Sequence, residues 1–307
     1  MPLHASILKT LAYFDLFSYS LTKEELYGFL WQEKISYPDF LDALNSSASG
    51  WEEKDGYYFL AGRSALVENR RRRLVVSEIK LKIARRAAKK IKVVPFLRAI
   101  FVCNSVGAGL AGKESDIDFF IVTTPGRLWL VRFLTNLILK IFRLRTYGER
   151  RQDKICLSFF VDENSLDLAP LKAVAEDVHF AFWLYQMTPI YDPRNYYGKF
   201  LAANRWVNEF LPNIKKETFS PMAFSLPDAG SGFLKKIWEK ILSGWLGDFK
   251  ERALKSFQLI WLKPSLKEAA KRGDSGVVLV DNVFKSHDND NRKEIWERWK
   301  LIVNNNQ

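Results

Sequence analysis

The 307-residue sequence predicts an α+β protein in which helices precede and follow a small mixed β-sheet. Three apolar runs rich in β-branched and aromatic residues, at 99–103, 117–123 and 155–161, predict the strands. On either side of them, apolar residues recur at the spacing of three and four that is typical of amphipathic helices. Hydrophobic residues make up 48% of the chain and aromatic residues 14%, which is enough for a buried core and excludes a disordered chain.

Residues 1–64 are predicted to form an N-terminal module of their own. Apolar residues at helical spacing predict three short helices, and Thr22 followed by Glu25 is a capping box that begins the second of them. Asp55-Gly56 between two β-leaning runs predicts a tight hairpin. Three helices and a hairpin resemble a winged helix, which binds DNA in some proteins and protein partners in others.

Residues 65–92 are predicted to form a long basic helix that links this module to the sheet. Such a helix either follows the phosphates of a nucleic acid or turns its charges toward water. The net charge of the chain is +12 and its pI is near 9.5, which favours anionic partners such as nucleotides, nucleic acid or a lipid surface.

The most informative segment runs from Asn104 to Asp118, between the first two predicted strands. It contains a hydroxyl residue and three glycines: Ser105, Gly107, Gly109 and Gly112. Glycines let backbone N–H groups approach an anion closely, and a helix start adds favourable dipoles. Because residues i and i+2 of a strand share a face, Asp116 and Asp118 are expected to project together. Two carboxylates that close repel unless a cation lies between them, and Mg²⁺ prefers one or two carboxylates plus phosphate oxygens.

This segment resembles the nucleotidyltransferase superfamily related to DNA polymerase β. The family pattern is Gly-Ser, an interval with a glycine, and Asp-x-Asp on the next strand, and it is matched by Ser105, Gly109, Ser115, Asp116 and Asp118. Asn104 replaces the family's first glycine, and asparagine tolerates unusual backbone angles. The resemblance implies a nucleotidyltransferase core at 93–165, followed by a mostly helical C-terminal domain at 166–307.

The resemblance also implies a reaction, the Mg²⁺-dependent transfer of a nucleoside monophosphate from ATP or another nucleoside triphosphate to an acceptor hydroxyl. The acceptor would be a protein, an RNA or a small molecule. Asp116 and Asp118 would hold the metal ion as catalytic residues. The nucleotide-binding residues would be Asn104, Ser105, Gly107, Gly109, Lys113 and Ser115.

The third strand departs from the family, whose catalytic members commonly carry a third acid in mid-strand, where this chain has Ser158. Asp162 shares a face with Ser158 by period-two counting and is the expected catalytic base. Glu176 and Asp177, on a following predicted helix, are alternatives. The missing acid leaves open a second interpretation, a catalytically weak or inactive nucleotide-binding protein whose winged helix binds nucleic acid or a partner.

Residues 166–307 are predicted to be mostly helical, with one long tryptophan-rich helix at 233–262 and a short strand at 277–280. The predicted helices at 127–145 and 233–262 combine basic and aromatic residues. That composition allows a third interpretation, association with a membrane surface, although helices that pack on a sheet have the same composition.

No segment is predicted to span a membrane, because the most apolar run, 128–142, is short and contains Arg132 and Lys140. A signal-peptide pattern is missing from the start of the sequence. Cys103 and Cys156 lie in predicted strands, which favours buried thiols over a disulfide. Together these features predict a cytoplasmic protein.

Overall fold

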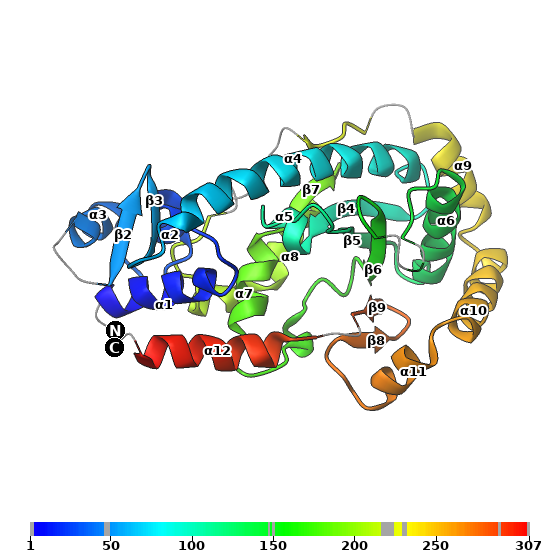
Figure 1. Cartoon of the computed structure of the whole chain (residues 1–307). Coiled ribbons are helices and arrows are strands. Elements are labelled where there is room, and N and C mark those ends of the chain that lie inside the picture. The colour runs from blue at the N-terminus through cyan, green and yellow to red at the C-terminus, as the bar shows by residue number, and fades with distance from the viewer. Residues whose placement is uncertain are drawn as a thin grey trace.

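The computed structural model describes residues 3–45, 50–146, 148, 151–215, 224–228, 232–287 and 290–305. It confirms the predicted α+β class, with helices packed around mixed β-sheets (Figure 1). The strands form one sheet of three strands and one of six. Within the described ranges, none of the helices combines the length and the apolar character that crossing a bilayer requires.

The N-terminal module has the element order that the sequence predicts, with one additional short strand. Its elements are α1 (Leu3–Asp15), β1 (Leu21–Thr22), α2 (Lys23–Gly28), α3 (Tyr37–Asn45), β2 (Trp51–Lys54) and β3 (Tyr57–Leu60). The capping box is present, because the Glu25 N–H donates to Thr22 Oγ1 at 3.2 Å and the Thr22 N–H donates to Glu25 Oε2 at 3.0 Å. Asp55 and Gly56 both adopt positive φ angles, as a tight hairpin turn requires. β1 pairs with β3, which closes the three-stranded sheet.

The centre of the larger sheet consists of the three predicted strands, each confirmed to within two residues. They are β4 (Leu97–Cys103), β5 (Ile117–Thr123) and β6 (Ile155–Asp162). β4 runs antiparallel to β5, and a four-residue helix, α5 (Asn104–Gly107), begins the connection between them. β5 runs parallel to β6, so their connection must cross over the sheet, and α6 (Leu128–Ile141) makes that crossover.

The larger sheet extends beyond residue 165, where the sequence analysis ended the core. β7 (Thr188–Tyr191) pairs with β4, and β9 (Val283–Ser286) pairs with β6 and with β8 (Val277–Leu279). The strand order is therefore β7-β4-β5-β6-β9-β8. Strand edges expose unpaired N–H and C=O groups, and these later strands satisfy them on both sides of the predicted three. The segment 166–307 thus completes the sheet and does not stand apart from it.

Helices cover both faces of the larger sheet. α4 (Ala65–Ile91) and α6 contribute to the core on one face, where Ile100, Val102, Phe119 and Ile121 project. α7 (Val178–Tyr185) and α8 (Tyr196–Ala203) cover the other face, where Phe101, Phe120, Val122 and Phe159 project. Two short 3₁₀ helices, at Ala169–Leu171 and Arg205–Glu209, flank these two helices in the sequence.

The predicted long helix at 233–262 is two helices, α9 (Gly232–Ile241) and α10 (Trp245–Ile260). The first turn of α10 packs closely against the connection between the two helices, because a Cβ atom on Gly247 would lie 1.8 Å from the Leu242 carbonyl oxygen. α11 (Pro264–Lys271) precedes β8, and α12 (Arg292–Asn305) returns to the N-terminal module. The indole N–H of Trp299 donates to the Lys9 carbonyl at 2.9 Å, which brings the two ends of the chain together (Figure 1).

Candidate functional site

Asp116 and Asp118 project to the same side at the start of β5, as the sequence predicts. Cys156, on the neighbouring strand β6, lies directly opposite Asp118 in the sheet register. One ligand atom from each of these three residues lies within 4.8 Å of the other two. The sheet therefore assembles two carboxylates and a thiol at one end of its two central strands.

Burial leaves the two carboxylates poorly solvated. Asp118 is 8% exposed, and it accepts a hydrogen bond from Ser158 Oγ at 3.3 Å. Burial raises the pKa of Asp116, and the nearby charge of Asp118 raises it further. Burial also raises the pKa of Asp118, and hydrogen bonds from Asn104, Cys156 and Ser158 partly offset that effect. A divalent cation between the carboxylates would relieve both the desolvation and the repulsion.

β6 contains a β-bulge beside the paired carboxylates. Asp118 opposes Cys156, but Phe120 opposes Phe159, so β6 contains one more residue than β5 over this interval. Bulges redirect side chains and occur often beside active sites. Here the bulge lets both Cys156 and Ser158 reach Asp118. Because the bulge interrupts the alternation of side chains between the two faces of the sheet, the period-two relation predicted between Ser158 and Asp162 does not hold. The sequence does contain a signal for Cys156, because it lies two residues before Ser158 and is therefore expected on the same face of the strand.

The register places Asp162, the predicted catalytic base, away from the paired carboxylates. Asp162 lies opposite Thr123, at the far end of β5 from Asp118. Six residues separate it from Cys156 along β6, which corresponds to about 20 Å at the usual rise per residue of a strand. Its carboxylate accepts the N–H of Asn164 at 3.0 Å. At that distance it cannot remove a proton from an acceptor bound at Asp116 and Asp118.

Asp177, the alternative base, is committed to a structural role. It caps the N-terminus of α7 by accepting the Phe180 N–H at 3.0 Å, and it forms an ion pair with Arg292 at 2.9 Å. Its side chain is 1% exposed. A buried, ion-paired cap is not available for proton transfer to a substrate.

A cavity of about 480 Å³ lies between α1, α5, α7 and the segment that connects β9 to α12. Asn104 and Ser105 line it, so the structure brings these two predicted nucleotide-binding residues to an open site. Its aromatic lining includes Tyr13, Phe17, Phe180 and Trp183. Its basic lining includes Arg73, Lys285, His287 and Arg292.

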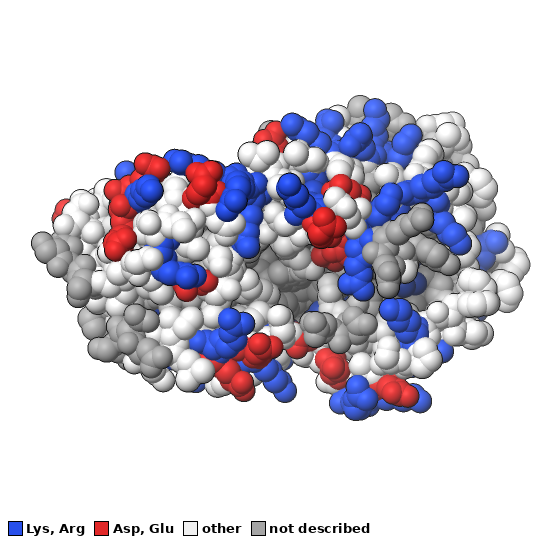
Figure 2. All heavy atoms as spheres, in the orientation of Figure 1, with Lys and Arg blue, Asp and Glu red and all other residues white. Residues whose placement is uncertain are grey.

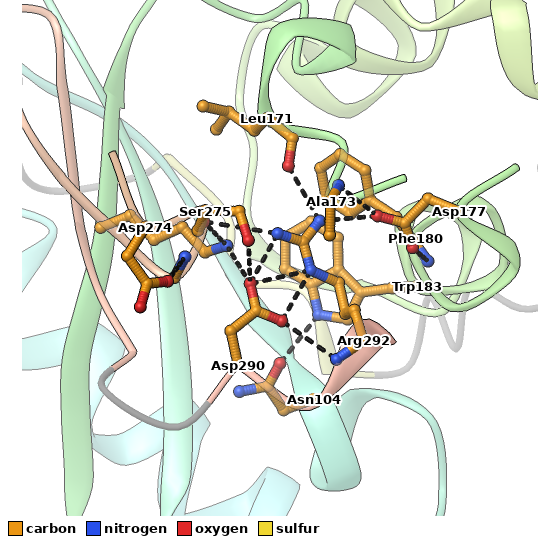
Figure 3. Close-up of polar contacts among 12 residues, drawn as sticks. Asn104, Leu171, Ala173, Asp177, Phe180, Trp183, Asp274, Ser275, Asp290 and Arg292 are labelled. Atoms are coloured by element: carbon orange, nitrogen blue, oxygen red, sulfur yellow. Dashed lines mark hydrogen bonds and ion pairs between the residues drawn. The ribbon is translucent and has the colours of Figure 1, made fainter. Parts of the chain in front are cut away.

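Asn104 connects this cavity to the paired carboxylates. Its φ is +55°, in the left-handed region that asparagine tolerates better than most residues. On one side it hydrogen-bonds to the Asp118 carboxylate, and on the other its Oδ1 accepts the indole N–H of Trp183 at 2.8 Å (Figure 3). Asn104 therefore has a side-chain role that a glycine at this position could not have.

Arg292 is the centre of a buried charge network in the wall of the cavity (Figure 3). Its guanidinium donates to both carboxylate oxygens of Asp290, to Asp177 and to the Leu171 carbonyl. Lys285 donates to the Ser275 carbonyl at 2.7 Å. Burial and the neighbouring Arg292 lower the pKa of Lys285 to about 8. The network fixes two cations at the cavity and pairs them with two carboxylates, because Lys285 Nζ also lies 3.6 Å from Asp290 Oδ2.

Gly107 and Gly109, both predicted to bind nucleotide, line a second cavity, beside α4. A Cβ atom on Gly107 would lie 2.5 Å from the Val102 carbonyl oxygen, so the packing of α5 onto β4 requires glycine there. Gly109 has a φ of +73°, which glycine adopts without strain. Backbone geometry accounts for both glycines without a bound phosphate.

Lys113 and Ser115, also predicted to bind nucleotide, belong to the turn before β5. The buried ammonium group of Lys80 donates to the carbonyls of Lys113 and Ser115 at 2.9 and 2.8 Å and to the Asp153 carboxylate at 2.6 Å. Ser115 Oγ accepts the Gly112 N–H at 3.0 Å. A basic residue of α4 thus holds this turn in place by its backbone, and Lys113 keeps an exposed side chain.

Comparison with known proteins identified no relative. No family model matches the chain, and neither a curated protein nor a solved structure does so.

Proposed function

We propose that the chain is a nucleotidyltransferase that uses Mg²⁺ to transfer a nucleoside monophosphate from a nucleoside triphosphate to an acceptor hydroxyl. One observation carries the proposal. Asp116 and Asp118 lie side by side at the end of the central strands, and Asn104 joins them to a cavity lined by basic and aromatic residues. The sequence resemblance to the polymerase β superfamily points to the same chemistry.

The residues present fit a divalent metal ion. Asp116 and Asp118 offer carboxylate oxygens, the donors that Mg²⁺ prefers, and the pKa of each is raised by burial. When bound, the ion would neutralise charge that develops on the phosphoryl oxygens. The thiol of Cys156 is a softer donor that suits Zn²⁺ better than Mg²⁺, so we assign the ion to the two carboxylates alone.

The cavity suits a nucleotide in size and lining. Its volume of about 480 Å³ lies within the usual range for sites that bind small molecules. The aromatic side chains offer faces on which a base can stack. Arg73, which lines the cavity, offers positive charge for the phosphates. Ser105 lines the cavity next to Asn104, and in the family pattern this serine contacts a phosphate.

The position of Cys156 favours a second candidate function. In the described residues, the third side chain grouped with Asp116 and Asp118 is a thiol, and burial raises its pKa to about 12. A neutral thiol is a poor general base at neutral pH. A protein that binds nucleotide and turns it over slowly, or not at all, would retain the two aspartates and lack the third carboxylate.

For the N-terminal module we propose a winged helix that contacts protein and not nucleic acid. α3 contains Asp39 and Asp42 but neither Lys nor Arg. The hairpin strand β2 adds Glu52 and Glu53. Lys54 is the one basic residue of β2, and Figure 2 shows acidic side chains beside basic ones at this end of the molecule. Such a surface repels phosphates, whereas nucleic-acid-binding modules attract them.

The decisive experiment combines transfer and binding measurements. The protein is incubated with α-labelled nucleoside triphosphates, Mg²⁺ and fractions of its own cell lysate, and Mg²⁺-dependent nucleotide affinity is measured by calorimetry. Asp118→Asn should reduce transfer by at least about a hundredfold, whereas Asp162→Asn, at the far end of the sheet, should leave it unchanged.

The possible outcomes separate the two candidates. Transfer that requires Asp118 supports the enzyme. Binding that requires Mg²⁺ and Asp118 without transfer supports the nucleotide-binding protein. If the protein neither binds nor transfers any nucleotide, both proposals are wrong.

A further inference from the structure

Helices α9 and α10 turn their apolar sides outward. Six apolar residues of α9 and the first turn of α10 are exposed, including Trp245, which is 80% exposed: Phe233, Leu234, Ile237, Trp238, Ile241 and Trp245. Along α10 and its C-cap the exposed residues are Phe249, Phe257, Ile260 and Trp261. Helices that cover a sheet place such residues against the core, so the arrangement is the reverse of the usual one.

The polar sides of both helices attach them to the protein. Glu239 accepts the Phe96 N–H and an Arg98 N–H, both at 2.7 Å. Glu251 accepts the N–H groups of Trp129 and Leu130 at 2.7 and 2.8 Å, which satisfies donors in the first turn of α6. These hydrogen bonds, together with Leu254 and Leu259 of α10, which pack against the core, hold the helices and fix which side faces out. Their apolar exposure follows from this attachment.

The same attachment point also fixes the junction between α9 and α10. Arg127 donates to the carbonyls of Leu242 and Ser243, both at 3.0 Å, and forms an ion pair with Asp248. The acidic residues of the two helices, Glu239, Asp248 and Glu251, all contact the body of the protein. The charges left at the outward surface of α9 and α10 are consequently basic.

Exposed lysine and arginine residues border the apolar surface. They are Lys236, Lys240, Lys250 and Arg252, all exposed. On the adjacent helix α6, Leu137 and Ile141 continue the apolar surface, since Phe133 contacts the ring of Phe257 with centroids 6.3 Å apart. In Figure 2, Lys and Arg gather over α4 and α6, beside the largely uncharged edge where α9 and α10 lie in Figure 1.

From this surface we propose that α9 and α10 lie flat on an anionic lipid membrane. Helices that lie in the membrane interface carry Trp, Phe and Leu on one side and Lys or Arg beside it. Trp238, Trp245 and Trp261 would sit at the level of the head groups, where the amphipathic indole ring is favoured. The basic border complements anionic head groups, and this charge match selects a lipid surface over a second copy of this basic chain.

The inference is independent of the proposed enzymatic function. It concerns the end of the molecule at α6, α9 and α10, and none of the residues named for it lines the cavity. If correct, it places the reaction at a membrane surface.

The test is flotation of the full-length protein with vesicles of phosphatidylcholine alone or mixed with phosphatidylglycerol. The protein should float with the anionic vesicles and less so as salt is raised. The double variant Trp245→Ser/Trp261→Ser should reduce binding at least about tenfold. Leu301→Ser, which removes a side chain 64% exposed on α12, is the matched control and should bind like the wild type.

A second pair of variants tests the charge. Lys236→Glu/Lys240→Glu should also reduce binding at least about tenfold, whereas Lys54→Glu on the hairpin of the N-terminal module should not. Quenching of tryptophan fluorescence by brominated lipid in the wild type gives an independent measure of contact.

Three results would overturn the proposal. The first is a protein that stays unbound with anionic vesicles, and the second is binding that survives loss of both tryptophans. The third is a dimer in solution that the tryptophan variant dissociates while vesicles fail to bind, which would make a second copy of the chain the occupant.

Discussion

Helices α7 and α10 contain similar aromatic side chains but place them in opposite environments. In α7, Phe180, Phe182, Trp183 and Tyr185 are all buried against the sheet and the N-terminal module. In α10, Trp245 and Phe249 point to solvent. The difference arises from the polar residues. The polar residue of α7, His179, lies at its first turn, whereas Glu251 and Gln258 of α10 lie on one side and find partners on α6. Aromatic content alone therefore does not show which side of a helix is buried.

The largest expected effect comes from truncating matched aromatic residues in the two helices. Phe182 is fully buried, so Phe182→Ala leaves a cavity and should lower the free energy of unfolding by about 3–5 kcal/mol. Trp245→Ala should change it by less than about 0.5 kcal/mol, because that side chain is already in water. Urea unfolding monitored by circular dichroism measures both. Equal losses would mean that Trp245 is buried in solution and that the aromatic residues of α7 and α10 do not differ in environment.

Lowering the pH should destabilise the folded protein through His179, which lies on α7. Burial and nearby Arg292 lower the pKa of His179 to about 4, and its Nδ1 is 2.9 Å from the Tyr13 hydroxyl. Because the unfolded chain protonates histidine near pH 6.5, unfolding takes up a proton between pH 6.5 and 4. Stability is therefore full above pH 6.5 and falls by about 3 kcal/mol as the pH drops to 4.

His179→Gln should flatten this part of the stability profile, measured by urea unfolding at a series of pH values. The control is His4→Gln, on α1, where the imidazole is partly exposed and its centroid lies 4.9 Å from that of the Trp51 ring. An unchanged slope in His179→Gln would show that the folded protein protonates this histidine normally.

A smaller loss of stability is expected at the contact between α10 and α6. Glu251→Ala removes the acceptor for two N–H groups at the start of α6 and should cost about 1–2 kcal/mol, as loss of a helix cap does. Hydrogen exchange should show faster exchange at Trp129 and Leu130. Glu294→Ala, in the first turn of α12, is the control. Unchanged protection at the start of α6 would contradict the account of why α10 faces outward.

The smallest effect belongs to the ion pair between Arg127 and Asp248. Asp248 is 59% exposed in this pair, and exposed pairs contribute little, so Asp248→Asn should cost less than about 1 kcal/mol. High salt should reduce the difference between variant and wild type further. A larger loss in the same urea assay would mean that the junction of α9 and α10 depends on charge more than on the Arg127 hydrogen bonds.

Local sequence determined the elements of this protein closely. The three central strands, the capping box at Thr22 and Glu25 and the hairpin at Asp55-Gly56 all follow from short-range patterns, and each is present. The same-side projection of Asp116 and Asp118 also followed from strand periodicity. These features depend only on residues close together in the chain, whose steric and hydrogen-bonding preferences act before any tertiary contact forms.

Only the tertiary structure decided which distant residues meet. Cys156 reaches Asp118 because a bulge shifts the register of β6, and Asp162 lies at the wrong end because β5 and β6 run parallel. The edges of the sheet are completed by strands from beyond residue 165, and the outward face of α9 and α10 follows from hydrogen bonds to partners more than a hundred residues away. Pairing register and the choice of a helix's buried side depend on such long-range partners, and the spacing of residues within one segment does not specify them.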